Sequence, residues 1–412
     1  MYKRQTHKAS IVGDVFNEGR LFIINADTSK ITSITNDASF GFGLTTFMGS
    51  TNAGTATITN QSFGATVFLE NSSAGNAKII NATGGTTTFG QGGGTETSTA
   101  GNATIDNNTG GSTAFFASTN AGTATITNQN GAVIFADTAS ASSATIVNNL
   151  GGVTIFGAGL TDTPTAGNAT ITNNNGGETN FFAFSTAANA KIITNSGGAT
   201  LFFDNATGGN AQFITVGTGF VDFSGSLGPN GDGRITAGSI AGSGFYYIGA
   251  GNTLVVGGNN LSTEVSGKIA DFDPCGCGVP GPGSLTKVGT GNLILSGVNT
   301  YTGATVVDGG ILSVNGSIAS SSGVTVNAGG TLGGNGIVSS TTINGGTLAP
   351  GNSVGLLTVQ GSLAFTAAAS YLVEVSGATA DRTNVTGAAT LGGATVNAVS
   401  YTHLTLPTIY SV

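Results

Sequence analysis

The chain holds few of the residue types that perform acid–base or nucleophilic chemistry. Its two histidines, His7 and His403, lie near opposite ends. The pattern Gly-x-Ser-x-Gly of a serine nucleophile occurs around Ser353, but Pro350 precedes it and a strand-like Leu-Leu-Thr-Val follows. A nucleophile elbow instead needs a strand before it, a helix after it and a histidine within reach. We therefore interpret Ser353 as a turn residue, and we expect neither a histidine-based triad nor a zinc site.

Carboxylates are the next candidates, because glycoside hydrolysis uses two carboxyl groups about 5–9.5 Å apart. The acids of the central part of the chain fall at different phases of its repeat, which predicts mostly different faces. These acids are Glu70, Glu96, Asp106, Asp137, Asp162, Glu178, Asp204 and Asp222. Asp204 and Asp222 follow phenylalanine-containing segments in neighbouring repeats and form one candidate pair. The alternative is that both are solvated corner residues, and we nominate no catalytic residue.

Two other groups of residues suggest metal or redox chemistry. Asp232, Asp271 and Asp273 could ligate calcium, but a single Gly-Asp-Gly is more often a turn. Cys275 and Cys277 are separated by one glycine, and three interpretations stay open: a loop disulfide in an exported protein, free thiols, or half of a metal site. One thiol pair cannot complete a zinc site. We expect no metal and no cofactor.

The composition narrows the class of protein. The 412 residues include 70 glycines, no tryptophan and only 7% charged residues, with a net charge of −8. The 11 basic residues are scattered singly, which disfavours a nucleic-acid partner. No run of 18 apolar residues occurs, so no transmembrane helix is predicted.

The elements that would position any site come from a repeat over residues 50–215. A phrase of the type Ala-Gly-Asn-Ala-Thr-Ile recurs, with its apolar closing residues at Ile58, Ile79, Ile105, Ile126, Ile146, Ile171, Ile192 and Phe213. A phenylalanine follows nine or ten residues later, at Phe68, Phe89, Phe115, Phe135, Phe156, Phe181 and Phe202. A polar residue follows two residues after the closing residue, at Asn60, Asn81, Asn107, Asn128, Asn148, Asn173, Thr194 and Thr215.

A fixed period of about 20–50 residues is the signature of stacked units that bury their apolar faces against each other. The apolar runs are short, rich in Ile, Val, Thr and Phe, and bounded by turn residues, which predicts strands. We therefore predict an all-β parallel β-helix, or β-solenoid, with coils of about 21 residues. Ile and Phe should form internal ladders, and the asparagines a stacked amide ladder at a corner in the αL conformation. Gln91 to Thr97 and Gly159 to Thr165 are predicted to be loops inserted at turns.

The composition also divides the chain. Residues 1–5 and 400–412 share neither the repeat nor the interior composition, and they resemble translated library or adaptor sequence. Residues 6–224 are predicted to form the solenoid array, and residues 225–282 an irregular turn-rich connection that contains the cysteine loop. Residues 283–399 carry a different strand repeat that continues the solenoid.

This last segment carries a resemblance to a known family. Residues 284–316, with the core Leu-Ser-Gly-Val-Asn-Thr-Tyr-Thr-Gly at 295–303, resemble the β-strand repeat of autotransporter (type V secretion) passenger domains. The phrases at 327–336 and 346–353 resemble the segment that leads toward the translocating barrel. The resemblance implies a right-handed β-helix displayed at the cell surface or secreted, and anchored at a bacterial outer membrane. The family pattern would continue into a C-terminal outer-membrane β-barrel after residue 399, which we expect in the full-length chain.

The function we infer is that of a structural or adhesive rod, acting in adhesion or self-association. The expected partners are host-cell or glycan surfaces, or further copies of the chain. Regularly spaced Thr, Ser and Asn on the outer face could bond glycans, although they could equally serve only to keep a weakly charged rod soluble. The alternatives are a β-helix passenger enzyme that degrades polysaccharides and a repeat adhesin outside the autotransporters.

Overall fold

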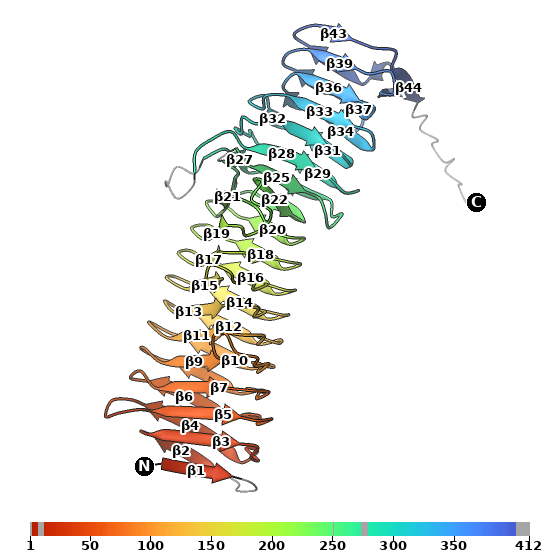
Figure 1. The fold of residues 1–412 in the computed structure, drawn as a ribbon. Coiled ribbons are helices and arrows are strands. Elements are labelled where there is room, and N and C mark those ends of the chain that lie inside the picture. The colour runs from red at the N-terminus through yellow and green to blue at the C-terminus, as the bar shows by residue number, and fades with distance from the viewer. Residues whose placement is uncertain (1, 7–11, 250, 273–278, 401–412) are drawn as a thin grey trace, which may run out of the picture.

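The computed structural model describes residues 2–6, 12–249, 251–272 and 279–400. In these ranges the chain forms 44 strands and no helix. Almost every strand pairs in parallel with its counterpart in the next coil, and one elongated stack runs from β1 to β44 (Figure 1). The predicted parallel β-solenoid is therefore confirmed.

One sheet, sheet B, runs along the whole stack. Its parallel strands, in spatial order, are β2 (Gly13–Asn17), β4 (Ile31–Asp37), β6 (Thr57–Gln61), β8 (Lys78–Asn81), β10 (Thr104–Asn107), β12 (Thr125–Asn128), β14 (Thr145–Asn148), β16 (Thr170–Asn173), β18 (Lys191–Thr194), β20 (Gln212–Thr215), β23 (Ser239–Gly242), β26 (Thr263–Val265), β29 (Asn292–Leu295), β31 (Gly310–Val314), β34 (Gly330–Gly334), β37 (Thr347–Pro350), β40 (Ser370–Ser376) and β44 (Thr395–Ser400). The short strand β41 (Thr379–Ala380) pairs antiparallel with β40.

A second sheet, sheet A, forms another side of the first part of the stack. Its strands are β1 (Tyr2–Thr6), β3 (Arg20–Ile24), β5 (Leu44–Met48), β7 (Ala65–Phe68), β9 (Thr86–Phe89), β11 (Ser112–Phe115), β13 (Ala132–Phe135), β15 (Val153–Phe156), β17 (Glu178–Phe181), β19 (Ala199–Asp204), β21 (Phe220–Ser226), β24 (Phe245–Tyr247) and β27 (Lys268–Ala270).

Two further sheets form sides of the later coils. Sheet D contains β22 (Arg234–Ala237), β25 (Thr253–Val256), β28 (Ser284–Lys287), β30 (Thr305–Val307), β33 (Val324–Asn327), β36 (Thr341–Asn344), β39 (Leu363–Phe365) and β43 (Ala389–Thr390). Sheet E contains β32 (Ser317–Ile318), β35 (Ile337–Val338), β38 (Leu356–Val359) and β42 (Arg382–Val385).

Each coil of the array has three sides, of which one is reduced to a single bridge. After a strand of sheet B the chain turns into a strand of sheet A, rounds a corner, and makes one parallel bridge before the next coil. The bridges join Asn52, Ser73, Thr99, Asn120, Ser140, Thr165, Thr186 and Thr207 in series. The alternation of buried and half-buried residues within each four-residue strand follows from the pleat.

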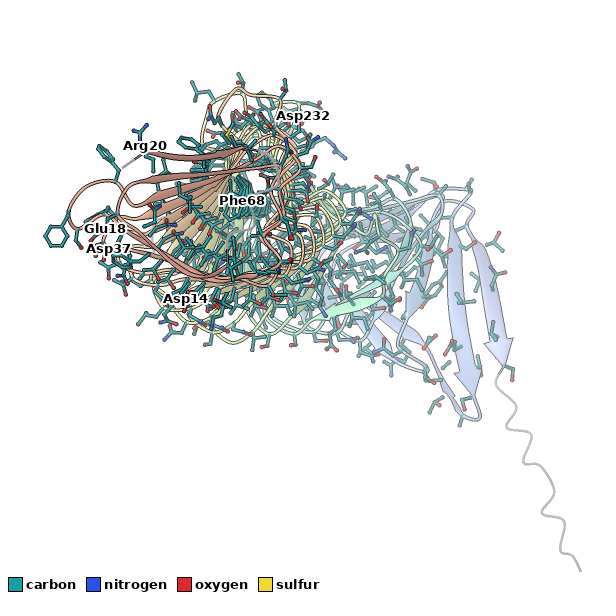
Figure 2. The ribbon with its side chains drawn as sticks, turned by 90° about the horizontal axis from the view of Figure 1, so that it is seen from below. Asp14, Glu18, Arg20, Asp37, Phe68 and Asp232 are labelled. Carbon is teal, nitrogen blue, oxygen red and sulfur yellow. The ribbon has the colours of Figure 1, made fainter. Side chains whose placement is uncertain are left out.

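The interior holds the predicted ladders. Neighbouring phenylalanine rings from Phe47 to Phe202 stack with centroids 4.7–4.9 Å apart and planes within 9° of parallel. Ile58, Ile79 and Ile126 are fully buried in strands that pair in register. Figure 2 looks along the stack from the N-terminal end and shows Phe68 inside, with charged side chains such as Asp14 at the outside.

The asparagine ladder is also present, but its predicted conformation is wrong. Each amide nitrogen donates to the side-chain oxygen of the asparagine one coil on, at 2.7–2.8 Å from Asn36 through Asn173. These asparagines lie within or at the ends of sheet B strands, are fully buried, and have no positive φ. Extended backbone turns their side chains inward, whereas αL corners would turn them away. The ladder therefore belongs to the core.

The three sides persist beyond the array, although their proportions change. At Thr207 the bridge side widens into sheet D, since Thr207 Oγ1 and Thr236 Oγ1 of β22 are 2.9 Å apart. On the opposite side, Thr300 donates its N–H to Ile269 of β27, and Val298 bridges to Ser317 of β32, so sheet A is succeeded by sheet E. The strand that follows sheet B shortens to two residues in β32 and β35, and the single bridge that precedes sheet B in the array is replaced by the strands of sheet D.

Candidate functional site

The serine pattern forms an exposed turn after β37. Ser353 lines a shallow hollow of about 450 Å³ on the outer side of sheet B, together with Glu374 and Asp381. Asp381 is engaged by the backbone, accepting from the N–H groups of Gly355 and Glu374 at 2.8 Å each. No base among the described residues bonds the Ser353 hydroxyl, and both histidines lie outside the described residues.

The structure does not bring the candidate carboxylate pair together. The register of β19 and β21 places Asp222 beside Leu201, whereas Asp204 lies beside Ser226 at the other end of the pairing. Asp222 accepts from Ser224 N–H at 2.8 Å and is nearly buried. A bulge in β21 adds to the separation along the strand. The candidate pair is therefore not formed, and the alternative of a solvated corner residue holds for the exposed Asp204 but not for the buried Asp222.

Asp204 instead shares its position with two other acids. Glu70, Asp137 and Asp204 each lie two residues after an inward phenylalanine, with φ between 52° and 58°. Each carboxylate accepts a hydrogen bond, at 2.7–3.0 Å, from the backbone N–H of the equivalent corner residue one coil earlier: Gly49, Ala117 and Ala183 respectively. The prediction that the acids lie on different faces fails for these three, because insertions shift their sequence spacing but not their place in the coil.

The candidate calcium ligands are held by the chain itself. Asp271 accepts from the N–H groups of Gly283 and Thr302 and from the Thr302 hydroxyl, at 2.6–3.1 Å. Asp232 accepts from Arg234 N–H within its turn. Asp273, Cys275 and Cys277 lie outside the described residues. In the part of the chain that the structure describes, no three acidic, histidine or cysteine side chains gather as a metal site would require.

The segment that carries the family resemblance is built from structural side chains. Lys287 is 1% exposed, and its Nζ donates to the carbonyls of Val288, Gly289 and Gly309 at 2.7–3.5 Å. Burial lowers the pKa of Lys287 to about 8. Tyr301 is fully buried with its hydroxyl 2.8 Å from Thr305 Oγ1, and burial raises its pKa.

The outer surface carries few charges. Among the described residues, Lys78 and Asp106 form an ion pair on the outer face of sheet B, with Nζ and Oδ2 3.9 Å apart. Hydrogen bonds from Ser39 and Gln61 hold the pKa of the half-buried Asp37 at about 2. No helix of the described residues has the length and apolar character to cross a bilayer.

Comparisons with known proteins point to one class. Residues 285–314, from β28 to β31, match the passenger-associated-transport-repeat family. An extracellular serine protease of Serratia marcescens is 41% identical over 73 residues, which are 18% of this chain and 7% of that protein. The adhesin BmaC autotransporter of Brucella suis biovar 1 (strain 1330) is 39% identical over 85 residues, which are 21% of this chain and 2% of that protein.

A solved structure of a hyper-glycosylated TibA fragment aligns with 94% of this chain and 97% of its own length, at 14% identity and a TM-score of 0.27. The chain thus spans only a small share of the curated relatives it matches, and the fold rests on its own strand pairing. By their names, the Serratia marcescens relative is extracellular and the Brucella suis relative is an autotransporter adhesin. The segment that matches the transport repeat lies within a continuous parallel solenoid, and in this respect the chain is similar to autotransporter passengers.

Proposed function

We propose that the chain is the rod of an autotransporter and acts by adhesion or self-association rather than by catalysis. The observation that carries this proposal is the contrast between the interior and the surface. The inner amides and rings satisfy each other coil after coil, which makes a stiff support, while the outer strand positions are rich in Thr and poor in charge. Many weak contacts along such a surface can add up through multivalency.

The arrangement of polar groups supports the non-enzymatic part of the proposal. Among the carboxylates that sequence analysis singled out, Asp137, Asp204, Asp222 and Asp271 accept hydrogen bonds from nearby backbone. A catalytic site would need a nucleophile or a general base directed into a pocket. The protease relative matches over too short a segment to transfer its activity.

The test is to shorten the rod without disturbing its ladders. Asn81 and Asn148 hold the same position in β8 and β14, so deleting residues 82–148 removes three whole coils and rejoins Asn81 to Asn149 in register. Displayed on a non-aggregating Gram-negative host with a complete autotransporter anchor, this variant should reach the surface but settle and adhere more weakly than the full rod. Equal adhesion by both rods, or by the host without either, would refute the proposal for these coils.

A further inference from the structure

Two corners of the array carry the same three features, 66 or 67 residues apart. The first feature is a glycine that follows an inward phenylalanine and begins an inserted loop. The second is an outward phenylalanine one coil on, and the third is a corner acid in the coil after that. The first corner contains Gly90, Phe116 and Asp137, and the second contains Gly157, Phe182 and Asp204.

The first corner is filled by its own loop. Gly93 donates its backbone N–H to Asp137 Oδ2 at 3.1 Å, alongside the bond from Ala117 at 2.8 Å. The loop backbone also passes the aromatic ring, since a methyl group built on Gly92 would lie 3.9 Å from Phe116 Cδ1. A turn of the chain thus places backbone near the ring and a hydrogen-bond donor at the carboxylate.

The second corner is open. Its loop is held back by Asp162, whose Oδ2 accepts from the N–H groups of Ala158 and Gly159 at 2.9 and 2.8 Å. A hollow of about 320 Å³ remains, lined by Gly157, Ala158, Gly159, Leu160, Phe182, Ala183 and Asp204. Asp204 accepts only the Ala183 N–H among the described residues through its side chain, so its Oδ1 is available.

The ring of Phe182 offers one face to this hollow. Its other face is covered by Phe203, whose ring stacks on it at 4.8 Å with the planes 9° apart. The register places Gly157 in the coil on the uncovered side, where no side chain can shield the ring. Leu160, which is 90% exposed, stands at the rim. The hollow therefore combines an aromatic face, an aliphatic rim and a carboxylate acceptor.

We propose that this hollow binds one neutral hexose unit of a glycan. The C–H face of a pyranose would pack on Phe182, and a hydroxyl would donate to Asp204. These are the two contacts that the glycine turn makes at the first corner. The volume lies at the lower end of the range of about 300–1,000 Å³ for small-molecule pockets, which suits one sugar ring better than a peptide segment. The negative carboxylate disfavours acidic sugars. The inference deepens the proposed adhesive function, on which it rests, by naming a ligand class.

The first corner provides matched controls for the test. The whole chain would be titrated with maltohexaose, cellohexaose, mannohexaose and chitohexaose, and with hexagalacturonate as the acidic comparison, using saturation-transfer NMR and calorimetry. At least one neutral hexamer should bind, and Phe182→Ala or Asp204→Asn should weaken it by about tenfold or more. Phe116→Ala and Asp137→Asn should change the affinity by less than about twofold. Leu160→Asp tests whether the rim contributes to the affinity for the hexamer, at a position too exposed for the change to affect folding.

Each of three results would overturn the proposal of a hexose site. These are binding of no neutral hexamer, tighter binding of hexagalacturonate, and equal losses at the two corners. If cells displaying the Phe182 and Asp204 variants still adhere while hexamer binding is lost, the sugar site is not what the adhesion uses, and the proposed function stands. If the full rod fails to adhere although the hexamer binds, the proposed function falls and the site remains.

Discussion

The array up to β21 and the coils from β22 onward solve the same packing problem with different interiors. The array places one residue type in each internal position of successive coils, as Phe115 over Phe135 and Asn107 over Asn128 show. The later coils are filled mainly by Leu and Val, such as Leu312 over Leu332, and contain the buried Lys287.

The difference teaches what an internal ladder requires. Flat rings and amides match a neighbour only if the next coil presents the same group at the same height, so the array keeps a constant register while its insertions leave at the corners. Aliphatic side chains have no such orientation and tolerate coils of unequal length. The array should therefore be more sensitive to single changes than the later coils.

The largest effect is expected when a ring is removed from the middle of the ladder. Phe135→Ala should cost about 3–5 kcal/mol of the free energy of unfolding, because a fully buried ring and two stacking contacts are lost. Urea unfolding followed by circular dichroism measures the loss. The control is Phe184→Ala at an exposed corner, which should stay within about 0.5 kcal/mol. Equal losses in the free energy of unfolding for the two variants would show that the ring stack does not stabilise the array more than an exposed ring does.

The next largest effect concerns the amide ladder. Asn107 bonds Asn81, Asn128, Thr113 and the Ala132 carbonyl, so Asn107→Ala leaves buried partners unsatisfied and should cost about 3 kcal/mol. Asn107→Thr should cost less, because Thr194 occupies this position one coil after Asn173, the last asparagine of the ladder, and bonds Thr200 at 2.9 Å.

The matched control for the ladder is Asn102→Ala. Asn102 also donates to an asparagine of the neighbouring coil, Asn76, but at an exposed position and 3.1 Å. Its loss should change the free energy of unfolding by less than about 0.5 kcal/mol. If the buried and exposed asparagines prove equally dispensable in thermal melts, burial does not decide the value of an amide ladder.

A smaller effect concerns how the stability of the two regions depends on pH. Lys287 has a pKa of about 8 when folded, below its ordinary value of 10.5. Between these values the unfolded chain binds more protons than the folded chain, so the stability of the later coils should rise with pH from about 8 to about 10.5. Hydrogen exchange at amides of β28 to β31 across this range measures the change. Lys287→Met should abolish the dependence, and a stability that falls over this range would contradict it.

The smallest effect is expected at the surface of the array. The Lys78–Asp106 pair is at 3.9 Å, with side chains 54% and 34% exposed, so Lys78→Ala should change the free energy of unfolding by less than about 0.5 kcal/mol. Raising the salt concentration should leave the melting temperature of the array nearly unchanged. A marked salt dependence would mean that charge, and not the ladders, stabilises these coils.

The repeat could be predicted because each coil repeats its inward residues in a near-constant phase. Ile58, Phe68 and Asn60 recur with their neighbours, and identical spacing implies identical placement wherever no loop intervenes. The site could be predicted much less well. Asp137 and Asp204 each lie two residues after an inward phenylalanine, but only the structure shows that a carboxylate at this corner accepts a backbone N–H of the previous coil.

Some sequence predictions remain predictions. The division of the chain at residues 224, 282 and 399, and the origin of residues 1–5 and 400–412, depend on composition alone. The redox state of Cys275 and Cys277 concerns a loop outside the described residues. The resemblance at 295–303 indicated a class of protein, whereas the burial of Tyr301 and its contact with Thr305 came from the structure.

By itself the sequence determined that this chain stacks, because the period and the Ile, Phe and Asn positions leave one way to bury each coil against the next. Only the tertiary structure decided which side of the coil each residue faces: asparagines expected at corners lie inside, and acids expected on separate faces share one edge. The physical reason is that sequence spacing measures distance along the chain. A hollow such as that between Phe182 and Asp204 depends instead on distance across coils, and an inserted loop lengthens the spacing along the chain without moving the corners.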